Sequence, residues 1–179
     1  MSSVIPLNKY LNDNYEKSAF DSAMNDPLPW VYHLHGRRIV SARLIRNSTY
    51  DIVLLIDGQP EEEIPKTSVK LLYPSAHTEA AAGLIKVDSK VRTRELEPII
   101  RPGDRHHVKN KTLFPLMEER TVLFFTLLEG EIIRGLVTAF SRYDLTVSLK
   151  GGVSVVVMRH TVLDVRDKKG RCYLKAGIE

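Results

Sequence analysis

The chain has 179 residues, of which 43% are hydrophobic and 27% charged, and its formal net charge is +4 at pH 7. This length allows one domain or two small ones, and the mild positive charge is compatible with a polyanionic partner without requiring one. The single cysteine, Cys172, excludes an intrachain disulfide bond and favours a reducing compartment. No apolar run approaches the ~20 residues that a membrane-spanning helix needs, and no signal-peptide pattern is seen, so we expect a cytoplasmic protein without a membrane partner.

The first predicted elements lie between residues 12 and 73. Apolar residues spaced as on one helical face predict a helix over residues 12–24, and Pro27 and Pro29 end it. Trp30 then begins a stretch of short apolar runs separated by polar turn residues, which extends to Tyr73. Runs of this kind predict short antiparallel strands.

A connector rich in lysine, arginine, proline and glycine follows, over residues 74–111. A loop of this length without structure of its own is uncommon in a compact domain, so we expect either a short strand over residues 84–87 or a connector that stays partly mobile. Thr112 is predicted to N-cap a short helix over residues 113–119. That helix would lead directly into the last strand-rich stretch.

The stretch from Val122 to Val165 consists of short apolar runs separated by turn signals. These signals are Glu129-Gly130, Ser141-Arg142, Lys150-Gly151-Gly152 and Arg159-His160. The runs are rich in valine, isoleucine, leucine, phenylalanine and threonine, which is typical of a meander of antiparallel strands. Five short strands in about 45 residues are too few for a sandwich and suit a small, strongly bent sheet that closes as a barrel.

The two strand-rich stretches match each other at a constant spacing of 93 residues (143 − 50 = 93; 159 − 66 = 93). The matching pairs are Ala42 with Gly135, Tyr50 with Tyr143, and Lys66 with Arg159. Only the first turn, His35-Gly36 against Glu129-Gly130, differs by one residue. An equal spacing through four strands indicates two copies of one unit. The alternative is that any two meanders look alike.

We therefore expect four regions along the chain. Residues 1–74 hold a helix and a first barrel, residues 75–110 form a basic connector, residues 111–167 hold a short helix and a second barrel, and residues 168–179 form a basic tail. A barrel this small has a thin core and would be marginal alone, so each copy is expected to need a neighbour. We expect the tail to be exposed and loosely held.

Five segments of the second copy share their order and spacing with a known family. They are Leu113 to Arg120, Leu127-Leu128-Glu129-Gly130, Gly135, Phe140-Ser141-Arg142-Tyr143 and Met158-Arg159-His160-Thr161-Val162. This pattern resembles the bacterial Sm-like RNA chaperone family, Hfq, over residues 111–165 and, more weakly, over residues 30–73. The resemblance implies a mainly β protein of two five-stranded, strongly bent Sm-like (SH3-like) barrels in tandem, each preceded by a short helix.

The resemblance also implies a function in post-transcriptional regulation through single-stranded RNA, such as U-rich RNA. Family members assemble as rings of six barrels, so two barrels per chain imply a homo-oligomer of three chains, a pseudo-hexamer. The implied RNA-binding residues are Tyr143, Arg159, His160 and Arg142 in the second copy, and Tyr50 and Lys66 in the first. A tyrosine face stacks an unpaired base, while a guanidinium or imidazole group supplies hydrogen-bond donors.

The chain departs from the family pattern at three positions. Thr126 stands where members often carry an aromatic residue on the adenine-binding face, which puts binding of A-rich RNA in doubt. The first copy has Thr67 where the second has His160, and Asn47 where the second has Phe140. The first copy is therefore the weaker candidate for the central RNA site.

The candidate residues also have structural interpretations, which stay open at this point. Tyr143 could pack in the core beside Phe140. His160 could be a turn residue that bonds to the backbone, and Arg142 could be a solvated turn residue. The sequence alone does not choose between these roles and RNA contacts.

Two equivalent segments differ in their suitability as edge strands. Val153–Val157 is β-branched and uncharged, so we expect it to pair with an edge strand of a neighbouring barrel. The equivalent segment, Pro60–Ile64, carries a proline and three glutamates, which discourage such pairing. Identical head-to-tail contacts close into a ring when the rotation fits, and the two junctions around this ring are expected to differ in strength.

No motif in the chain supports catalysis, a cofactor or a metal site. Phosphate-cradling glycine loops, zinc-binding H-E-x-x-H runs and serine–histidine–aspartate arrangements are missing, so we expect no enzyme. His33 and His35 alternate along one strand, but no third ligand is spaced to complete a metal site with them.

Two rival functions remain. The acidic run Glu61 to Glu63 and the weaker first copy favour a ring-forming scaffold or regulatory protein that has lost RNA binding. A single-chain adaptor of two barrels would form no ring and would be a monomer in solution.

Overall fold

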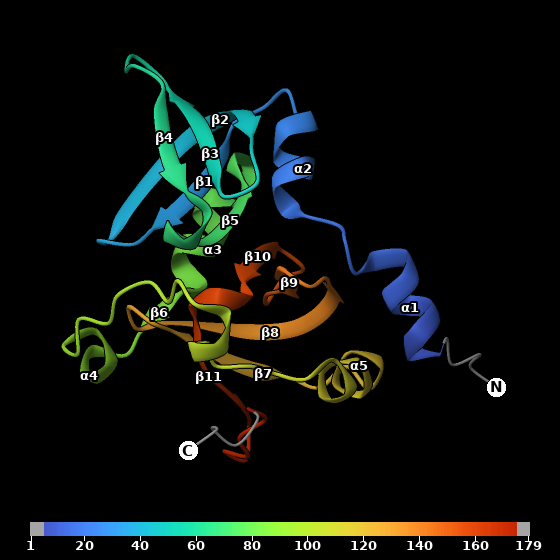
Figure 1. The fold of residues 1–179 in the computed structure, drawn as a ribbon. Coiled ribbons are helices and arrows are strands. Elements are labelled where there is room, and N and C mark those ends of the chain that lie inside the picture. The colour runs from blue at the N-terminus through green and yellow to red at the C-terminus, as the bar shows by residue number, and fades with distance from the viewer. Residues whose placement is uncertain (1–5, 175–179) are drawn as a thin grey trace.

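The computed structural model describes residues 6–174 and contains one open, antiparallel sheet of 11 strands with a few short helices (Figure 1). The protein is therefore mainly β. Along the sheet the strands follow the order β11-β7-β8-β9-β10-β5-β1-β2-β3-β4, and β6 pairs with β8 outside this path. The sheet thus consists of two halves, β1–β5 and β7–β11, that meet where β10 pairs with β5.

Residues 30–74 form the first half, and two short helices precede it. The helices are α1 (Leu7–Asn14) and α2 (Ala19–Asn25). The strands are β1 (Trp30–Leu34), β2 (Arg38–Asn47), β3 (Asp51–Ile56), β4 (Glu62–Pro65) and β5 (Val69–Pro74), with the 3-10 turn η1 (Lys66–Ser68) before β5. The single helix predicted over residues 12–24 is wrong, because Ser18 adopts an extended conformation and its side chain caps α2 by accepting from the Phe20 N–H.

The second half repeats this arrangement. It comprises α5 (Asn110–Glu118), β7 (Leu123–Leu127), β8 (Glu131–Phe140), β9 (Asp144–Ser148), β10 (Ser154–Met158), the 3-10 turn η4 (Arg159–Thr161) and β11 (Val162–Asp167). The helix predicted over residues 113–119 is present but begins earlier. Thr112 lies inside this helix and does not cap it, because its first turn already starts at Asn110.

The connector between the halves has structure of its own. It contains η2 (Ser75–His77), α3 (Thr78–Leu84), β6 (Lys86–Val87), α4 (Ser89–Arg92) and η3 (Pro102–Asp104). The predicted strand over residues 84–87 is shorter than expected, because Leu84 belongs to the end of α3. β6 pairs with the start of β8, Lys86 opposite Ile132, so the connector is anchored on the second half.

The 93-residue spacing recurs in the backbone. Both bounds of β1 and β7, of β2 and β8, and of β5 and β11 differ by 93 residues. A β-bulge between Leu44 and Arg46 in the first half recurs between Val137 and Ala139 in the second. Bulges bend strands and strengthen their twist, so the same irregularity at the same position gives both halves a similar curvature.

The first turn has the same length in both halves, although its glycine moves by one position. In the first half Gly36 and Arg37 both have positive φ angles, 87° and 59°. In the second half Gly130, with φ 96°, takes the place equivalent to Arg37. The sequence offset of one residue in this turn therefore reflects a shifted glycine and not an insertion.

Two hydrophobic clusters form the core, one centred on each half. Trp30, Tyr32 and Leu34 of β1 face the first cluster, whereas Val31 of the same strand belongs to the second. β1 is therefore buried along its whole length, which explains why its sequence does not alternate between apolar and polar residues. The central strands of the sheet join the two cores into one continuous body.

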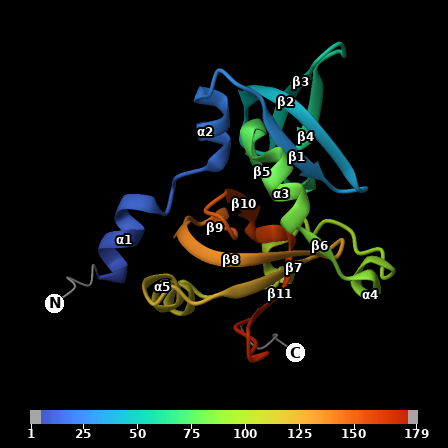
Figure 2. The same cartoon turned by 180° about the vertical axis from the view of Figure 1, so that it is seen from behind.

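The sequence predicted that each half closes into a barrel, but the strand pairing of the halves does not close. Within residues 6–174, β4 does not pair with β5, and β10 does not pair with β11. β10 instead pairs with β5, with Val156 opposite Leu72 and Val157 opposite Leu71. The segment predicted as an assembly edge thus finds its partner inside the chain, because the first half offers an apolar strand edge. β4 and β11 are left at the two ends of the sheet (Figure 2).

The basic tail is exposed as predicted, but its described part is not free of the sheet. Residues 168–172 are exposed, and the chain then folds back so that Cys172 forms a bridge with Arg166 of β11. Residues 175–179 lie outside the described part of the chain, so the basic character expected at Lys175 cannot be placed on the fold.

Candidate functional site

In the first half, Tyr50 and Lys66 lie at neighbouring turns. The Lys66 N–H donates to the Tyr50 carbonyl at 2.9 Å, which joins the β2–β3 turn to η1. The side chain of Tyr50 is 80% exposed. The Lys66 ammonium lies 5.4 Å from the centre of the Phe20 ring, and burial lowers the pKa of Lys66. This turn therefore exposes the Tyr50 ring, and the backbone of Lys66 is bonded to the backbone of Tyr50.

The second half builds the same turn from Arg142, Tyr143 and Arg159. The Arg159 N–H donates to the Tyr143 carbonyl at 2.9 Å, as Lys66 does to Tyr50. The Tyr143 side chain is 42% exposed. The Arg142 guanidinium lies 5.3 Å from the Tyr143 ring centre and 5.6 Å from that of Tyr15. The structure thus places a cation over the tyrosine ring in the second half, whereas in the first half only the backbone of Lys66 contacts Tyr50 and its ammonium lies over Phe20.

The N-terminal segment covers the turn of the second half. Arg142 donates its backbone N–H to the Tyr15 carbonyl at 2.8 Å, and its guanidinium pairs with Glu16 at 3.3 Å. The Tyr10 hydroxyl accepts from the Phe140 N–H at 2.8 Å. In both overall views α1 lies next to α5, beside this end of β8 (Figures 1 and 2). Within the described residues, Tyr50 has no comparable cover.

The guanidinium of Arg159 is directed into the protein. It donates to the Asn110 side chain at 2.9 Å and to the Val108 carbonyl at 3.4 Å, and it lies over the Phe140 ring. Burial lowers the pKa of Arg159. Its donors therefore hold α5 and the end of the connector against the second half.

His160 lies buried at the boundary between the halves. Its Nε2 atom is 2.8 Å from the Val69 carbonyl of β5. Because a carbonyl oxygen only accepts, Nε2 carries the hydrogen. Burial lowers the pKa of His160 to about 4, although the bond to Val69 acts in the opposite direction. His160 is therefore neutral at pH 7 and joins the two halves, which matches the backbone-bonded alternative and not an open RNA contact.

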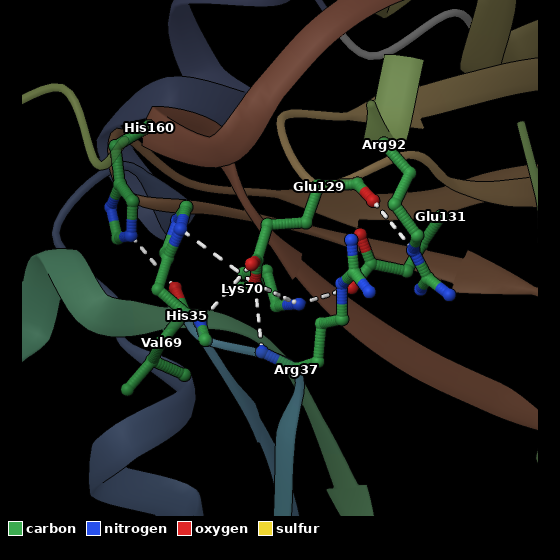
Figure 3. Close-up of polar contacts among 9 residues, drawn as sticks. His35, Arg37, Val69, Lys70, Arg92, Glu129, Glu131 and His160 are labelled. Carbon is green, nitrogen blue, oxygen red and sulfur yellow. Dashed lines mark hydrogen bonds and ion pairs between the residues drawn. The ribbon is translucent and has the colours of Figure 1, made fainter. Parts of the chain in front are cut away.

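A buried ionic cluster lies at the same boundary (Figure 3). Lys70 of β5 is 2% exposed, and its ammonium pairs with Glu129 at 2.6 Å and with the buried Glu131. Burial acts to raise the pKa of Glu129, but the bonds from Lys70, Arg37 and Gly36 outweigh it, so this pKa is lowered. One lysine of the first half thus pairs with two carboxylates of the second.

The turn after β1 closes around this cluster. The N–H groups of Gly36 and Arg37 donate to the two carboxylate oxygens of Glu129, at 3.1 and 3.3 Å. His35 lies 3.8 Å from the same carboxylate, and burial lowers its pKa. Arg92 of the connector donates to the Glu129 carbonyl at 3.3 Å (Figure 3). Three separate segments therefore converge on Glu129.

A groove of about 350 Å³ opens beside Glu129. The residues that line it are His35, Gly36, Arg37, Arg92, Glu129 and the segment 95–98. Two guanidinium groups and three carboxylates face it, so its charge is nearly balanced and selects neither an anion nor a cation. This groove therefore does not define a ligand class.

Sequence reasoning missed the ionic cluster, although one signal pointed to it. Lys70 interrupts an apolar strand, Val69 to Tyr73, where a charge is costly unless it is paired. Of the two glutamates that pair with it, Glu129 was interpreted only as part of a turn, and Glu131 was not singled out. Nothing in the local pattern indicates that this turn meets β5, because the partners are separated by about 60 residues, as in Lys70 and Glu131.

Comparisons with family models, curated proteins and solved structures found no match to this chain. Among residues 6–174, no helix is long and apolar enough to cross a membrane. The same residues contain no group of three or more histidine, cysteine, aspartate or glutamate side chains suited to a metal ion. His33, for example, bonds to the Tyr73 hydroxyl at 2.9 Å. The function must therefore be argued from the geometry of the two halves.

Proposed function

We propose that the chain is an RNA-binding protein of the Sm-like, Hfq-like type that holds single-stranded RNA and acts in post-transcriptional regulation. The observation that carries this proposal is the repeated turn, which exposes Tyr50 in one half and Tyr143 in the other and adds a cation, Arg142, over the Tyr143 ring. An exposed aromatic ring stacks an unpaired base of any sequence, and a nearby cation attracts the phosphate backbone.

The proposal assigns different roles to the candidate residues. Tyr50 and Tyr143 stack bases, and Lys66 and Arg142 attract phosphate groups. Arg159 and His160 act as structural residues, because their side chains bond to Asn110 and Val69 inside the protein. Tyr50 is the main contact, since its ring is almost fully exposed whereas Tyr143 is partly covered.

The proposal includes two Sm-like barrels and a ring of three chains. Each half has the strand order of a five-stranded, bent sheet, and the β10–β5 junction joins the halves head to tail. Repeating this junction between chains would pair β4 of one copy with β11 of the next. Identical head-to-tail contacts close into a ring when the rotation fits. A cytoplasmic location belongs to the same proposal and rests on the lone Cys172.

Binding of a labelled oligo-U RNA, followed by fluorescence anisotropy at several salt concentrations, tests this function. The Tyr50→Ala variant should bind about 5- to 150-fold more weakly, because base stacking contributes about 1–3 kcal/mol. Tyr50→Phe retains the ring and serves as the matched control, with affinity close to that of the native chain. The native chain should also lose affinity as salt rises. Absence of binding at low salt contradicts the proposal.

The second candidate is a scaffold of the same fold that has lost RNA binding. The specific observation in its favour is that His160 and Arg159 are both engaged in internal contacts. Purified protein without bound nucleic acid, judged from an absorbance ratio equal to that of protein alone, together with a failure to bind oligo-U, would establish this alternative.

A further inference from the structure

The junction between the halves provides a template for a contact between chains. β10 pairs with β5 through Val156 opposite Leu72 and Val157 opposite Leu71. Subtracting the 93-residue spacing from the β10 residues, and adding it to the β5 residues, gives the equivalent residues in the two end strands of the sheet. These are Glu63 and Ile64 in β4, and Val165 and Asp164 in β11. A second copy docked in the same way would place Glu63 opposite Val165.

The outer edge of β11 is already occupied, by the chain's own tail. The Tyr173 N–H donates to the Val165 carbonyl at 3.0 Å, and Cys172 forms a bridge with Arg166. Val165 is the equivalent of Leu72, which pairs with β10 at the internal junction. Tyr173 therefore uses the same backbone acceptor that Glu63 of a second copy would need.

Asp167 holds this tail turn in place. Its carboxylate accepts from the N–H groups of Lys169 and Arg171 at 2.9 and 3.0 Å, and from the Tyr173 hydroxyl at 2.9 Å. Its backbone N–H donates to the Arg171 carbonyl at 3.1 Å. One half-buried side chain thus organises the whole turn, and such a local structure opens at far lower cost than the core of the sheet.

One pair of opposite charges would face across the two edges. Antiparallel pairing with Glu63 opposite Val165 places Glu62 opposite Arg166. Opposite charges directly across two strands stabilise their pairing. Glu62 and Arg166, which pair with Arg38 and Asp164 in the single chain, would therefore meet across the two docked edges.

From these contacts we infer that the outer edge of β11 is the docking edge for β4 of a second copy, and that residues 168–174 form a removable cap over it. This inference rests on the head-to-tail assembly in the proposed function. It adds that an isolated chain is protected from pairing until the tail turn opens, which is one way in which proteins protect an exposed strand edge.

Sedimentation velocity of the full chain over a concentration series tests the cap. Asp167→Ala removes three acceptor contacts of the turn and should tighten self-association by about ten-fold or more, since each hydrogen bond contributes about 0.5–1.5 kcal/mol. Asp104→Ala, at an exposed loop aspartate, is the matched control and should leave the association unchanged. Adding Glu63→Pro to Asp167→Ala should return the protein to a monomer, because proline lacks the N–H that would replace that of Tyr173.

Hydrogen exchange at the Tyr173 amide reports opening of the turn independently of assembly. Faster exchange in Asp167→Ala without any gain in mass overturns the inference, as does a native chain that is already fully assembled with this amide protected. If Asp167→Ala leaves the exchange unchanged, Tyr173→Pro is used in its place, because it removes the N–H that bonds to Val165. The same readout applies: no gain in mass with this variant overturns the inference. Oligo-U binding is measured separately, so failure of the cap and failure of the RNA-binding function are distinguishable.

Discussion

The two halves of the molecule have the same strand order but occupy different places in the sheet. In the first half, β5 pairs with strands on both sides, and Lys70 on it is buried. In the second half, β11 lies at the end of the sheet, and Leu163 stands at the position equivalent to Lys70. The comparison teaches that position in the sheet, and not the local backbone, determines which side chains must be paired inside the protein.

The turns that carry Tyr50 and Tyr143 differ in a similar way. Both have the same backbone bond, but Tyr10, Tyr15 and Glu16 contact only the second turn. The first copy, which the sequence ranked as the weaker RNA site, therefore has the more accessible tyrosine. Four substitutions test these differences between the halves, in order of decreasing effect.

Lys70→Leu places the residue type of the second half in the first and has the largest expected effect. Among residues 6–174 Lys70 is the only cation bonded to Glu131, so removing it leaves this buried carboxylate unpaired, which typically costs about 3–5 kcal/mol. Urea unfolding measures this loss. Lys150→Leu, at an exposed lysine, is the control and should change stability by less than about 0.5 kcal/mol. Equal effects of the two variants would show that the cluster does not stabilise the junction.

Gly135→Ala introduces into the second half the alanine that the first half has at position 42. A Cβ atom at Gly135 would overlap the Ser148 carbonyl and lie 2.7 Å from a methyl carbon of Val147. Overpacking of this kind costs about 1–3 kcal/mol, and here a backbone atom must move. The reverse change, Ala42→Gly, should cost only about 0.5–1 kcal/mol. Thermal unfolding of both variants measures the two losses of stability. The prediction is contradicted if Gly135→Ala is as stable as the native chain.

The pH dependence of stability should depend on His160, which the first half replaces by Thr67. Burial holds the pKa of His160 at about 4, below the 6.5 of an unperturbed histidine. The unfolded chain therefore binds the extra proton first, so stability is fully present above pH 6.5 and is lost as the pH falls from 6.5 toward 4. The contribution lost by pH 5 is about 2 kcal/mol.

Urea unfolding of His160→Gln at pH 7.5 and pH 5 measures this contribution, because glutamine can bond to Val69 but does not titrate. His106→Gln, at an exposed histidine, is the control and should retain the native acid sensitivity. His33, whose pKa burial also lowers to about 4, accounts for a second part of the acid sensitivity. An unchanged pH dependence in His160→Gln would contradict the assigned role.

Tyr10→Phe tests the cover over the second turn and has the smallest expected effect. It removes a hydroxyl that accepts from the Phe140 N–H and donates to the Phe140 carbonyl, which should cost about 1 kcal/mol. Hydrogen exchange at the Phe140 amide should become faster. Tyr50→Phe, at the uncovered turn, should leave both stability and exchange unchanged. Protection of the Phe140 amide that survives in Tyr10→Phe would show that α1 contributes no bond there.

Several features of the fold could be predicted because they are encoded locally. Apolar runs and turn residues located the strands, and the spacing between Tyr50 and Tyr143 located the repeat. The helix over residues 12–24 was wrong because capping by Ser18 breaks a pattern that otherwise looks continuous. Closure into barrels was also not found, since β10 pairs with the other half of the chain.

The candidate site was less predictable. The sequence placed His160 in a turn between two strands. It could not identify the acceptor, the Val69 carbonyl, because Val69 lies 91 residues earlier in the chain. The Lys70–Glu129 pair was equally unpredictable, because the sequence around either residue gives no sign of its partner. Local patterns carry no information about which strand edges meet, so these contacts became visible only in three dimensions.

The amino-acid sequence by itself determined the repeated strands and their turns, because side-chain periodicity and turn residues act over a few neighbouring positions. Only the tertiary structure decided that β10 pairs with β5, that Lys70 and His160 are buried between the halves, and that the tail lies on β11. Those outcomes depend on contacts between distant segments, which become favourable only when the sheet has brought its edges and charged groups together.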